Sequence, residues 1–514
     1  MSKPKILWSG DIIARTGFAR VTENLITRLK DKYEIVVLGN NWWGDPNEFQ
    51  KDFQMFPSSN RFATEPFGVQ RVREITENVK PDIVFVNNDA WIVNHIYEQI
   101  RELHEKKLFK FVAYMPMDSY GWTGCLNQYS NAWDGIYVYT KFGAEEFKLS
   151  GINKEVGVIP HGITDGQFYP MDKDEVRKKL SIPKDCFVVF NGNRNQARKR
   201  IDITIDAFAQ FAVGRPDTKL YLHMGMKDQG WDIMALFGRE MRKRDLDPNG
   251  RIIMTTRDAQ PPGVPVETLN MIYNSADVSV NTCKGEGHGL VNHESAACGV
   301  AQVVPNHTSL KEIFEGAAPL IDNCFMDVDM NFNRDMPVPS AAHLAEILGD
   351  LYEDRDLLKQ VGADCFQRAT SAKYQWDNIA EQFDEAFNKV LQPEEQEKPQ
   401  IKRRKRKPKK ELSMAKQWSP GASKAPFSWV PELWLNFLRL WLGSCQVQQV
   451  RFFDKVFFIK PVVTFWRHYL ESQQDSLVWH WSQRSINKSD GGDGGKGANT
   501  KFCRQKVTTS YRKG

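Results

Sequence analysis

Short apolar runs alternate with segments whose apolar residues recur every three or four positions through the first 390 residues. In the first 160 residues the apolar runs, which predict strands, lie at residues 5–8, 34–38, 82–86, 111–114 and 135–138. Between the first two runs, residues 10–18 are predicted as a loop and residues 20–29 as a helix. This alternation predicts βαβ units that assemble a parallel sheet.

A second series of apolar runs begins after residues 158–162, where Pro160 and Gly162 suit a connecting bend. Its predicted strands lie at residues 186–190, 220–223, 252–254, 278–280 and 301–304, and helical spacing over residues 341–391 closes this half. We therefore expect two doubly wound, Rossmann-like α/β lobes, residues 1–160 and 161–392. Ligands of such sheets bind beyond the carboxyl ends of the strands, so a cleft between facing lobes is the expected site.

The composition is typical of a folded protein. The 514 residues are 41% hydrophobic and 26% charged, with a net charge of +5. The eight cysteines lack the spacing of a zinc or redox pair, as expected for reduced thiols in a cytoplasmic protein.

No apolar run reaches the roughly 20 residues of a spanning helix, and residues 1–11 lack the apolar core of a signal peptide. Neither secretion nor a membrane span is expected.

The composition changes after residue 392. Residues 393–417 are predicted as a linker with eight basic side chains at positions 402–410, and residues 418–514 as an extension that holds seven of the fifteen tryptophans. Residues 434–442, rich in Trp and Leu, could lie at a membrane surface while the basic linker meets anionic lipid. The alternatives are an ordinary packed helix, a poorly ordered extension, a fused or misread segment, and a nuclear signal or nucleic-acid contact.

The stretch KGEGHGLVNHE, residues 284–294, places two acids around glycines. It follows a predicted strand and runs into a predicted helix, so the helix N-terminus would offer free N–H groups to phosphate oxygens. Eight helical steps from Glu286 to Glu294 span about 12 Å, which matches a ligand with hydroxyl groups at both ends and phosphates between. Surface charge on a loop and a helix is the plain alternative.

Cations for such phosphates are predicted after the first strand of the second lobe. Arg194 and Lys199 fall at the carboxyl end of that strand, where they could stabilise a departing diphosphate. The alternative is a solvated basic start of a helix.

Together these segments resemble glycosyltransferase family 4, retaining enzymes of the GT-B fold, over roughly residues 3–391. The resemblance rests on residues 158–163, 192–202, 273–278, 285–290, 294–299, 303–304 and 374–376. It implies that Arg194 and Lys199 hold the donor diphosphate, that Glu294 holds the nucleotide ribose, and that Glu286 contacts the transferred sugar. The amides of His288 and Gly289 would lie at the phosphates.

Two positions depart from the family pattern. In residues 16–20 the usual glycine pair of the first-lobe loop is reduced to Gly17. A histidine that many members carry in the first lobe is replaced by residues 114–118, where Asp118 is the polar residue nearest the expected place. We hypothesise that Asp118 contacts sugar or acceptor; a purely structural Asp is the alternative.

Other candidates are weaker. Asp327 and Asp329 have the form of a metal-binding pair, but the resemblance implies departure assisted by cations, with no metal and no cofactor. Residues 87–89 could touch an acceptor or cap a loop. His161 is expected to pack at the junction, and His288 and His293 to shape the site.

The sequence therefore predicts a retaining glycosyltransferase, of the hexosyltransferase class, that moves a sugar from a nucleoside-diphosphate sugar to a glycan, lipid, protein or small molecule. The alternatives are an epimerase or phosphorylase of the same fold, or a non-catalytic nucleotide-sugar or nucleic-acid binding protein. The predicted catalytic residues are Glu286, Arg194, Lys199 and Asp118. The predicted donor-binding residues are Gly17, Arg194, Lys199, Gly287, His288, Gly289, Leu290 and Glu294.

Overall fold

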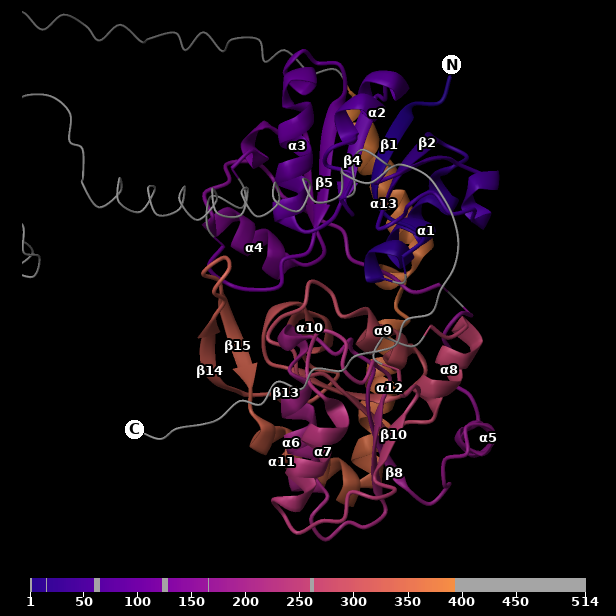
Figure 1. Cartoon of the computed structure of the whole chain (residues 1–514), viewed down its shortest axis with the longest axis vertical. Helices are drawn as coiled ribbons and strands as arrows, with labels where there is room; N and C mark the ends of the chain where they lie inside the picture. The colour runs from indigo at the N-terminus through magenta and orange to yellow at the C-terminus, as the bar shows by residue number, and fades with distance from the viewer. Residues whose placement is uncertain are drawn as a thin grey trace, which may run out of the picture. The chain divides into compact units, whose positions relative to one another are not determined.

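The computed structural model describes residues 2–14, 16–59, 65–122, 128–164, 166–258 and 263–392. Two parallel sheets, each flanked by helices, form two lobes (Figure 1). Residues 393–514, which include the predicted basic linker and Trp-rich extension, lie outside the described part of the chain.

The first sheet has seven parallel strands in the order β3-β2-β1-β4-β5-β6-β7. They are β1 Lys5–Asp11, β2 Glu34–Asn40, β3 Gln54–Pro57, β4 Ile83–Asn87, β5 Lys110–Met115, β6 Gly135–Val138 and β7 Gly157–Val158. The central strands are buried on both faces, which explains why they read as continuous apolar runs in the sequence. Because neighbouring strands are parallel, the carboxyl ends of β2, β1, β4 and β5 meet at one edge.

Helices cover both faces of this sheet. They are α1 Gly17–Leu29, α2 Val72–Val79, α3 Ala90–Glu105, α4 Lys141–Leu149 and, from the far end of the described chain, α13 Trp376–Leu391. The α1 helix begins after Thr16, whose hydroxyl accepts a hydrogen bond from the Ala19 amide at 3.1 Å. Short 3-10 turns lie at η1 Glu48–Lys51 and η3 Ser130–Ala132.

The second sheet has six parallel strands in the order β10-β9-β8-β11-β12-β13. They are β8 Phe187–Asn191, β9 Thr218–Leu222, β10 Ile252–Met254, β11 Val278–Val280, β12 Ala301–Pro305 and β13 Leu320–Ile321. The helices of this lobe are α5 Lys173–Lys179, α6 Ile201–Phe211, α7 Ile233–Arg242, α8 Val266–Asn274, α9 Leu290–Ala297, α10 Thr308–Phe314, α11 Ala341–Glu353 and α12 Arg355–Ala369, with 3-10 turns η4 Ala197–Lys199 and η5 Ala372–Tyr374.

An antiparallel hairpin, which the sequence analysis did not predict, extends from the second lobe. It is formed by β14 Asn323–Val328 and β15 Asp335–Pro339 (Figure 1). The main chains of Asp335 and Tyr120 exchange two hydrogen bonds of 3.0 Å, so the hairpin contacts the first lobe. A second contact joins α10 to α4, because the Glu312 carboxylate accepts the amides of Lys141 and Phe142 at 3.0 and 2.9 Å.

The last described helix, α13, differs from expectation. The helical spacing of residues 341–391 predicts helices of the second lobe, but the apolar face of α13 packs on the first sheet. Phe383 and Phe387 lie at ring-centroid distances of 5.7 and 5.4 Å from Phe85 of β4. The helical spacing of the apolar residues predicted the helix itself. Which of the two sheets buries the apolar face of that helix depends on the path of the chain, which the spacing does not record.

The chain consequently passes between the lobes twice. Ile163 and Gln375 form a parallel bridge, in which the Ile163 amide donates to the Tyr374 carbonyl at 2.8 Å. The Trp376 amide donates back to the Ile163 carbonyl at 3.3 Å. The two passages are therefore joined by main-chain hydrogen bonds.

Four of the five described cysteines are buried and all five are free thiols, as expected. None of the described helices combines the length and the apolar character that crossing a bilayer requires.

Candidate functional site

The acid-glycine-acid stretch connects β11 to α9 and faces the first lobe. Gly289 precedes α9 with a φ of +92°, a left-handed conformation that favours glycine, and a Cβ there would lie 2.5 Å from Leu310. A Cβ on Gly285 would lie 1.7 Å from the Asp118 carbonyl oxygen of the first lobe. A Cβ on Gly287 would lie 2.5 Å from Pro116. The glycines therefore let this loop contact the first lobe at main-chain distance.

The Lys199 ammonium pairs with the buried Glu286 carboxylate, and both groups belong to the second lobe. Arg198 donates to the Gly285 carbonyl and lies 3.5 Å from Glu286. Burial alone would raise the pKa of Glu286, but the charges of Lys199 and Arg198 lower it below its ordinary value. Glu286 is thus ionised at neutral pH and accepts hydrogen bonds, as a partner for sugar hydroxyl groups must.

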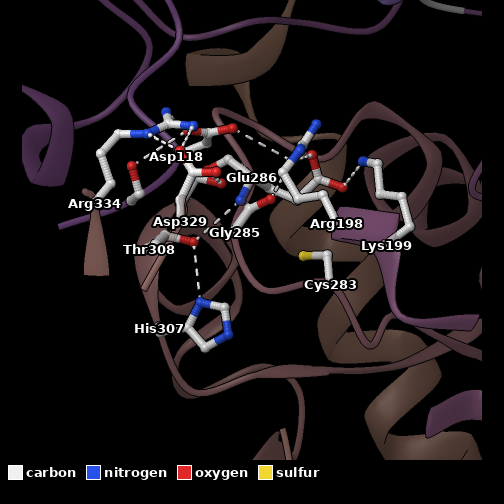
Figure 2. A network of polar contacts seen from close by, with 12 residues as sticks. Asp118, Arg198, Lys199, Cys283, Gly285, Glu286, His307, Thr308, Asp329 and Arg334 are labelled. Carbon is white, nitrogen blue, oxygen red and sulfur yellow. Dashed lines mark hydrogen bonds and ion pairs between the residues drawn. The ribbon is translucent and has the colours of Figure 1, made fainter. Parts of the chain in front are cut away.

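Asp118 contributes a carboxylate from the first lobe to the same network (Figure 2). It lies 3.5 Å from Arg198 and accepts a hydrogen bond of 3.0 Å from Arg334, which immediately precedes β15. Burial lowers the pKa of Arg198, but the charges of Asp118 and Glu286 outweigh that effect and raise it above the ordinary value. Two arginines of the second lobe therefore hold one acid of the first.

Glu294 lies on α9 and is buried. One carboxylate oxygen accepts a hydrogen bond of 2.8 Å from the Tyr273 hydroxyl, and the other pairs with Arg20 of α1. Burial and the Glu294 charge raise the pKa of Tyr273 well above its ordinary value, so its hydroxyl stays a donor. A carboxylate has about four acceptor positions, which leaves Glu294 able to accept further hydroxyl groups.

Arg194 is placed apart from these groups. Its guanidinium makes a bidentate pair with Asp228, with distances of 2.6 and 3.0 Å, and its side chain is 41% exposed. No contact of Arg194 with Glu286 or Glu294 is present among the described residues. The predicted role of Arg194 at the diphosphate stays a prediction. Arg198, for which no role was predicted, lies beside Glu286.

The remaining predicted donor-binding residues flank the acid-glycine-acid loop. A Cβ on Gly17 would lie 3.3 Å from Leu290, so the start of α1 lies against the start of α9. His288 and His293 are buried, and their rings are hydrogen-bonded at 3.0 Å. Burial lowers the pKa of His293 to about 4 and of His161 to about 3. These rings are neutral at pH 7, in keeping with a packing role.

The two acids considered as a weak candidate for a metal site, Asp327 and Asp329, each lie beside a basic side chain. Asp327 pairs with Lys284 at 2.6 Å, and Asp329 lies 3.4 Å from Arg334. Within the described residues, no three His, Cys, Asp or Glu side chains gather as ligands for a metal.

Solved GT-B glycosyltransferases share this architecture. Sucrose-phosphate synthase from Thermosynechococcus elongatus matches with a TM-score of 0.59 and 18% identity, over 76% of this chain and 99% of that one. HepE of Anabaena, solved in complex with UDP-glucose, matches with a TM-score of 0.56 and 15% identity, over 75% and 99%. The chain has the GT-B fold of glycosyltransferases, as predicted.

Curated relatives point to the same class. D-inositol 3-phosphate glycosyltransferase of Acidothermus cellulolyticus is 30% identical over 183 residues, which are 34% of this chain and 37% of that relative. The chain spans about a third to a half of the length of the curated relatives it matches. No protein-family model matches it. The relatives confirm the resemblance to glycosyltransferases that the motifs carry.

Three arginines of the site were missed or underweighted by the sequence analysis. Arg198 stands among four basic residues within seven positions, and only the turn η4 decides which of them faces Glu286. Arg20 belongs to the first-lobe loop motif, which was a signal, but its partner lies 274 positions away. Arg334 precedes a strand of the unpredicted hairpin, so no pattern indicated it.

Proposed function

We propose that this chain is a retaining glycosyltransferase that moves a sugar from a nucleoside-diphosphate sugar to an acceptor held by the first lobe. The observation that carries the proposal is the gathering of Lys199 and Arg198 at Glu286, beside the loop that leads into α9. Cations, main-chain amides and a helix N-terminus at one place suit a diphosphate leaving group.

The acids suit the two ends of such a donor. Glu286 is ionised and would accept hydroxyl groups of the transferred sugar, while Glu294, oriented by Tyr273 and Arg20, would accept those of the ribose. In the absence of a donor, Lys199 neutralises Glu286. On donor binding its ammonium would be shared with the diphosphate, and Arg198 would contribute a second positive charge.

The finer features are part of this proposal. Stabilisation of the departing diphosphate by Lys199 and Arg198 would let the acceptor attack from the same face, so that neither a bound metal nor a separate base is required. A cytoplasmic location, and membrane contact through residues 393–514, stay predictions from the sequence.

The test is hydrolysis and binding of nucleotide sugars by the full chain. A thermal-shift screen of UDP- and GDP-sugars identifies the donor, because a ligand at 100 times its Kd stabilises the native state by about 2.7 kcal/mol. Release of nucleoside diphosphate without acceptor then measures turnover. Lys199→Ala and Arg198→Ala should each lower kcat/KM for this release at least about 100-fold, as expected for lost charge stabilisation.

Lys179→Ala removes an exposed lysine of α5 and serves as the matched control, with turnover expected to be unchanged. Wild-type turnover in both site variants would refute the assignment. Binding of a nucleotide sugar without any release of diphosphate would favour the non-catalytic alternative. A product with an altered donor sugar and no transfer would favour an epimerase.

A further inference from the structure

Polar side chains gather at the carboxyl edge of the first sheet, beyond the residues used for the donor. Asp11 ends β1, Asn40 ends β2 and Asn87 ends β4, and Asp89 follows Asn87 by two positions. Asp118 follows β5 by three positions. Because β2, β1, β4 and β5 are neighbours in a parallel sheet, these groups lie along one edge.

Two buried amides at this edge have donors that no described residue accepts. Asn40 is fully buried, and neither its Nδ2 nor its Oδ1 atom has a hydrogen-bond partner among the described residues. Asn87 is also fully buried; its Oδ1 accepts from the Tyr139 hydroxyl at 3.1 Å, and its Nδ2 has no partner in the described part of the chain. An unsatisfied buried polar group costs about 1–3 kcal/mol, so a hydrogen-bonding partner supplied from outside the described residues would stabilise both amides.

Tyr139 links this edge to the donor loop. Its ring lies 3.3 Å from the position that a Cβ on Gly287 would take, while its hydroxyl contacts Asn87. The Tyr139 side chain therefore contacts both the Asn87 amide and the loop that would hold the transferred sugar. A hydroxyl group bound at this edge would lie close to the donor.

The charges at this edge are unfavourable for an anion. Asp89 has no hydrogen bond or ion pair with its carboxylate among the described residues, and burial and the charge of Asp118 raise its pKa to about 6. Asp11 accepts hydrogen bonds from Thr16 and Asn41 at 2.6 and 2.8 Å, not from a cation. A negative charge on either carboxylate would repel a phosphate ester.

The arginines nearest to this edge already form ion pairs with acidic side chains. Arg334 and Arg198 are paired with Asp118, and Arg198 is also required at the donor side. Two exposed tryptophans follow strands at the same edge: Trp43 after β2 is 59% exposed, and Trp91 after β4 is 36% exposed. Carboxylates, amides and exposed aromatic faces together suit a ring that carries many hydroxyl groups and no phosphate.

We propose that the acceptor of this enzyme is an uncharged saccharide or polyol, bound at the first-lobe edge by Asn40, Asn87 and Asp89. This inference rests on the proposed function and names the substrate class of its acceptor side. Phosphorylated forms of the same acceptors would be discriminated against by Asp89 and Asp11.

The experiment measures acceptor-stimulated release of nucleoside diphosphate by the full chain, with UDP-glucose as the first donor probe and the other screened nucleotide sugars after it. Matched acceptor pairs are glucose and glucose 6-phosphate, fructose and fructose 6-phosphate, and myo-inositol and its 3-phosphate. We expect at least one neutral member to stimulate release with a kcat/KM about tenfold or more above that of its phosphate ester, as one unshielded like charge would give.

Asp89→Asn keeps the shape and removes one negative charge, so it should reduce this discrimination by about tenfold. Asp31→Asn, at an exposed acid after α1, is the matched control and should leave the ratio unchanged. Preference for the phosphorylated members, or no stimulation by any saccharide or polyol while donor hydrolysis persists, would overturn the proposal. Absence of both donor binding and hydrolysis would overturn the proposed function itself, and the acceptor inference with it.

Discussion

The Asp89 carboxylate should make the folded protein less stable at neutral pH than at acidic pH. Its pKa is raised from 3.8 to about 6 by burial and by Asp118, with Arg198 and Arg334 acting in the opposite direction. A raised carboxyl pKa means that the native state holds the proton more tightly than the unfolded state. Stability is therefore lost as pH rises from about 4 to about 6, and by roughly 3 kcal/mol, since each pKa unit corresponds to 1.36 kcal/mol.

Asp89→Asn removes this penalty at every pH. The variant and the wild type should differ little in stability near pH 4, where Asp89 is protonated in the folded state and partly protonated in the unfolded state. Above pH 6 the variant should be more stable by about 3 kcal/mol, which corresponds to about 4 °C in Tm if the two lobes unfold together. Thermal unfolding followed by circular dichroism between pH 4 and pH 8 measures this difference.

The informative quantity is how the stability difference between Asp89→Asn and wild type changes with pH. The size of that difference at any single pH also contains packing effects of the substitution. Asp31→Asn is the control variant, since Asp31 is exposed and makes no ion pair among the described residues. A gap between Asp89→Asn and wild type that stays constant from pH 4 to pH 8, or that closes as pH rises, would refute the reasoning.

Three further outcomes follow from named contacts. Tyr273→Phe deletes the hydroxyl that donates to Glu294, so KM for the donor should rise about tenfold, the size of a charged hydrogen bond, with kcat nearly unchanged in steady-state assays. Gly285→Ala places a methyl group 1.7 Å from a first-lobe carbonyl oxygen and should lower turnover severely. Gly349→Ala of α11, where a Cβ would lie 3.7 Å from the Arg215 side chain, is the control and should leave turnover unchanged. Equal turnover in both variants would contradict the close approach. Phe383→Ala should destabilise the first lobe by about 3–5 kcal/mol, seen as a lower urea midpoint.

Much of the architecture was readable from the sequence because buried parallel strands are short continuous apolar runs. The runs at residues 34–38 and 82–86 correspond to β2 and β4, and the acid-glycine-acid loop connects a strand to a helix as predicted. The pairing of Lys199 with Glu286 also fits the motifs, since both follow neighbouring strands of one sheet. Features that are local in sequence, or fixed by adjacent strands, were therefore predictable.

Contacts between lobes were not predictable in the same way. The pairing of Arg20 with Glu294 depends on how two separately folded sheets are oriented, which no local pattern records. The choice of Arg198 over Arg194 as the neighbour of Glu286 depends on the backbone of η4, which is followed by Arg200 in a left-handed conformation. The attachment of α13 to the first lobe is likewise a matter of chain path.

That path limits how the two halves can move. Two covalent passages join the halves, and they are hydrogen-bonded to each other through Ile163, Tyr374 and Trp376. A motion that drew the two passages apart would break those main-chain bonds. In the proposed glycosyltransferase, the paired passages would therefore restrict how far one lobe shifts against the other, and so help to keep the reacting atoms aligned.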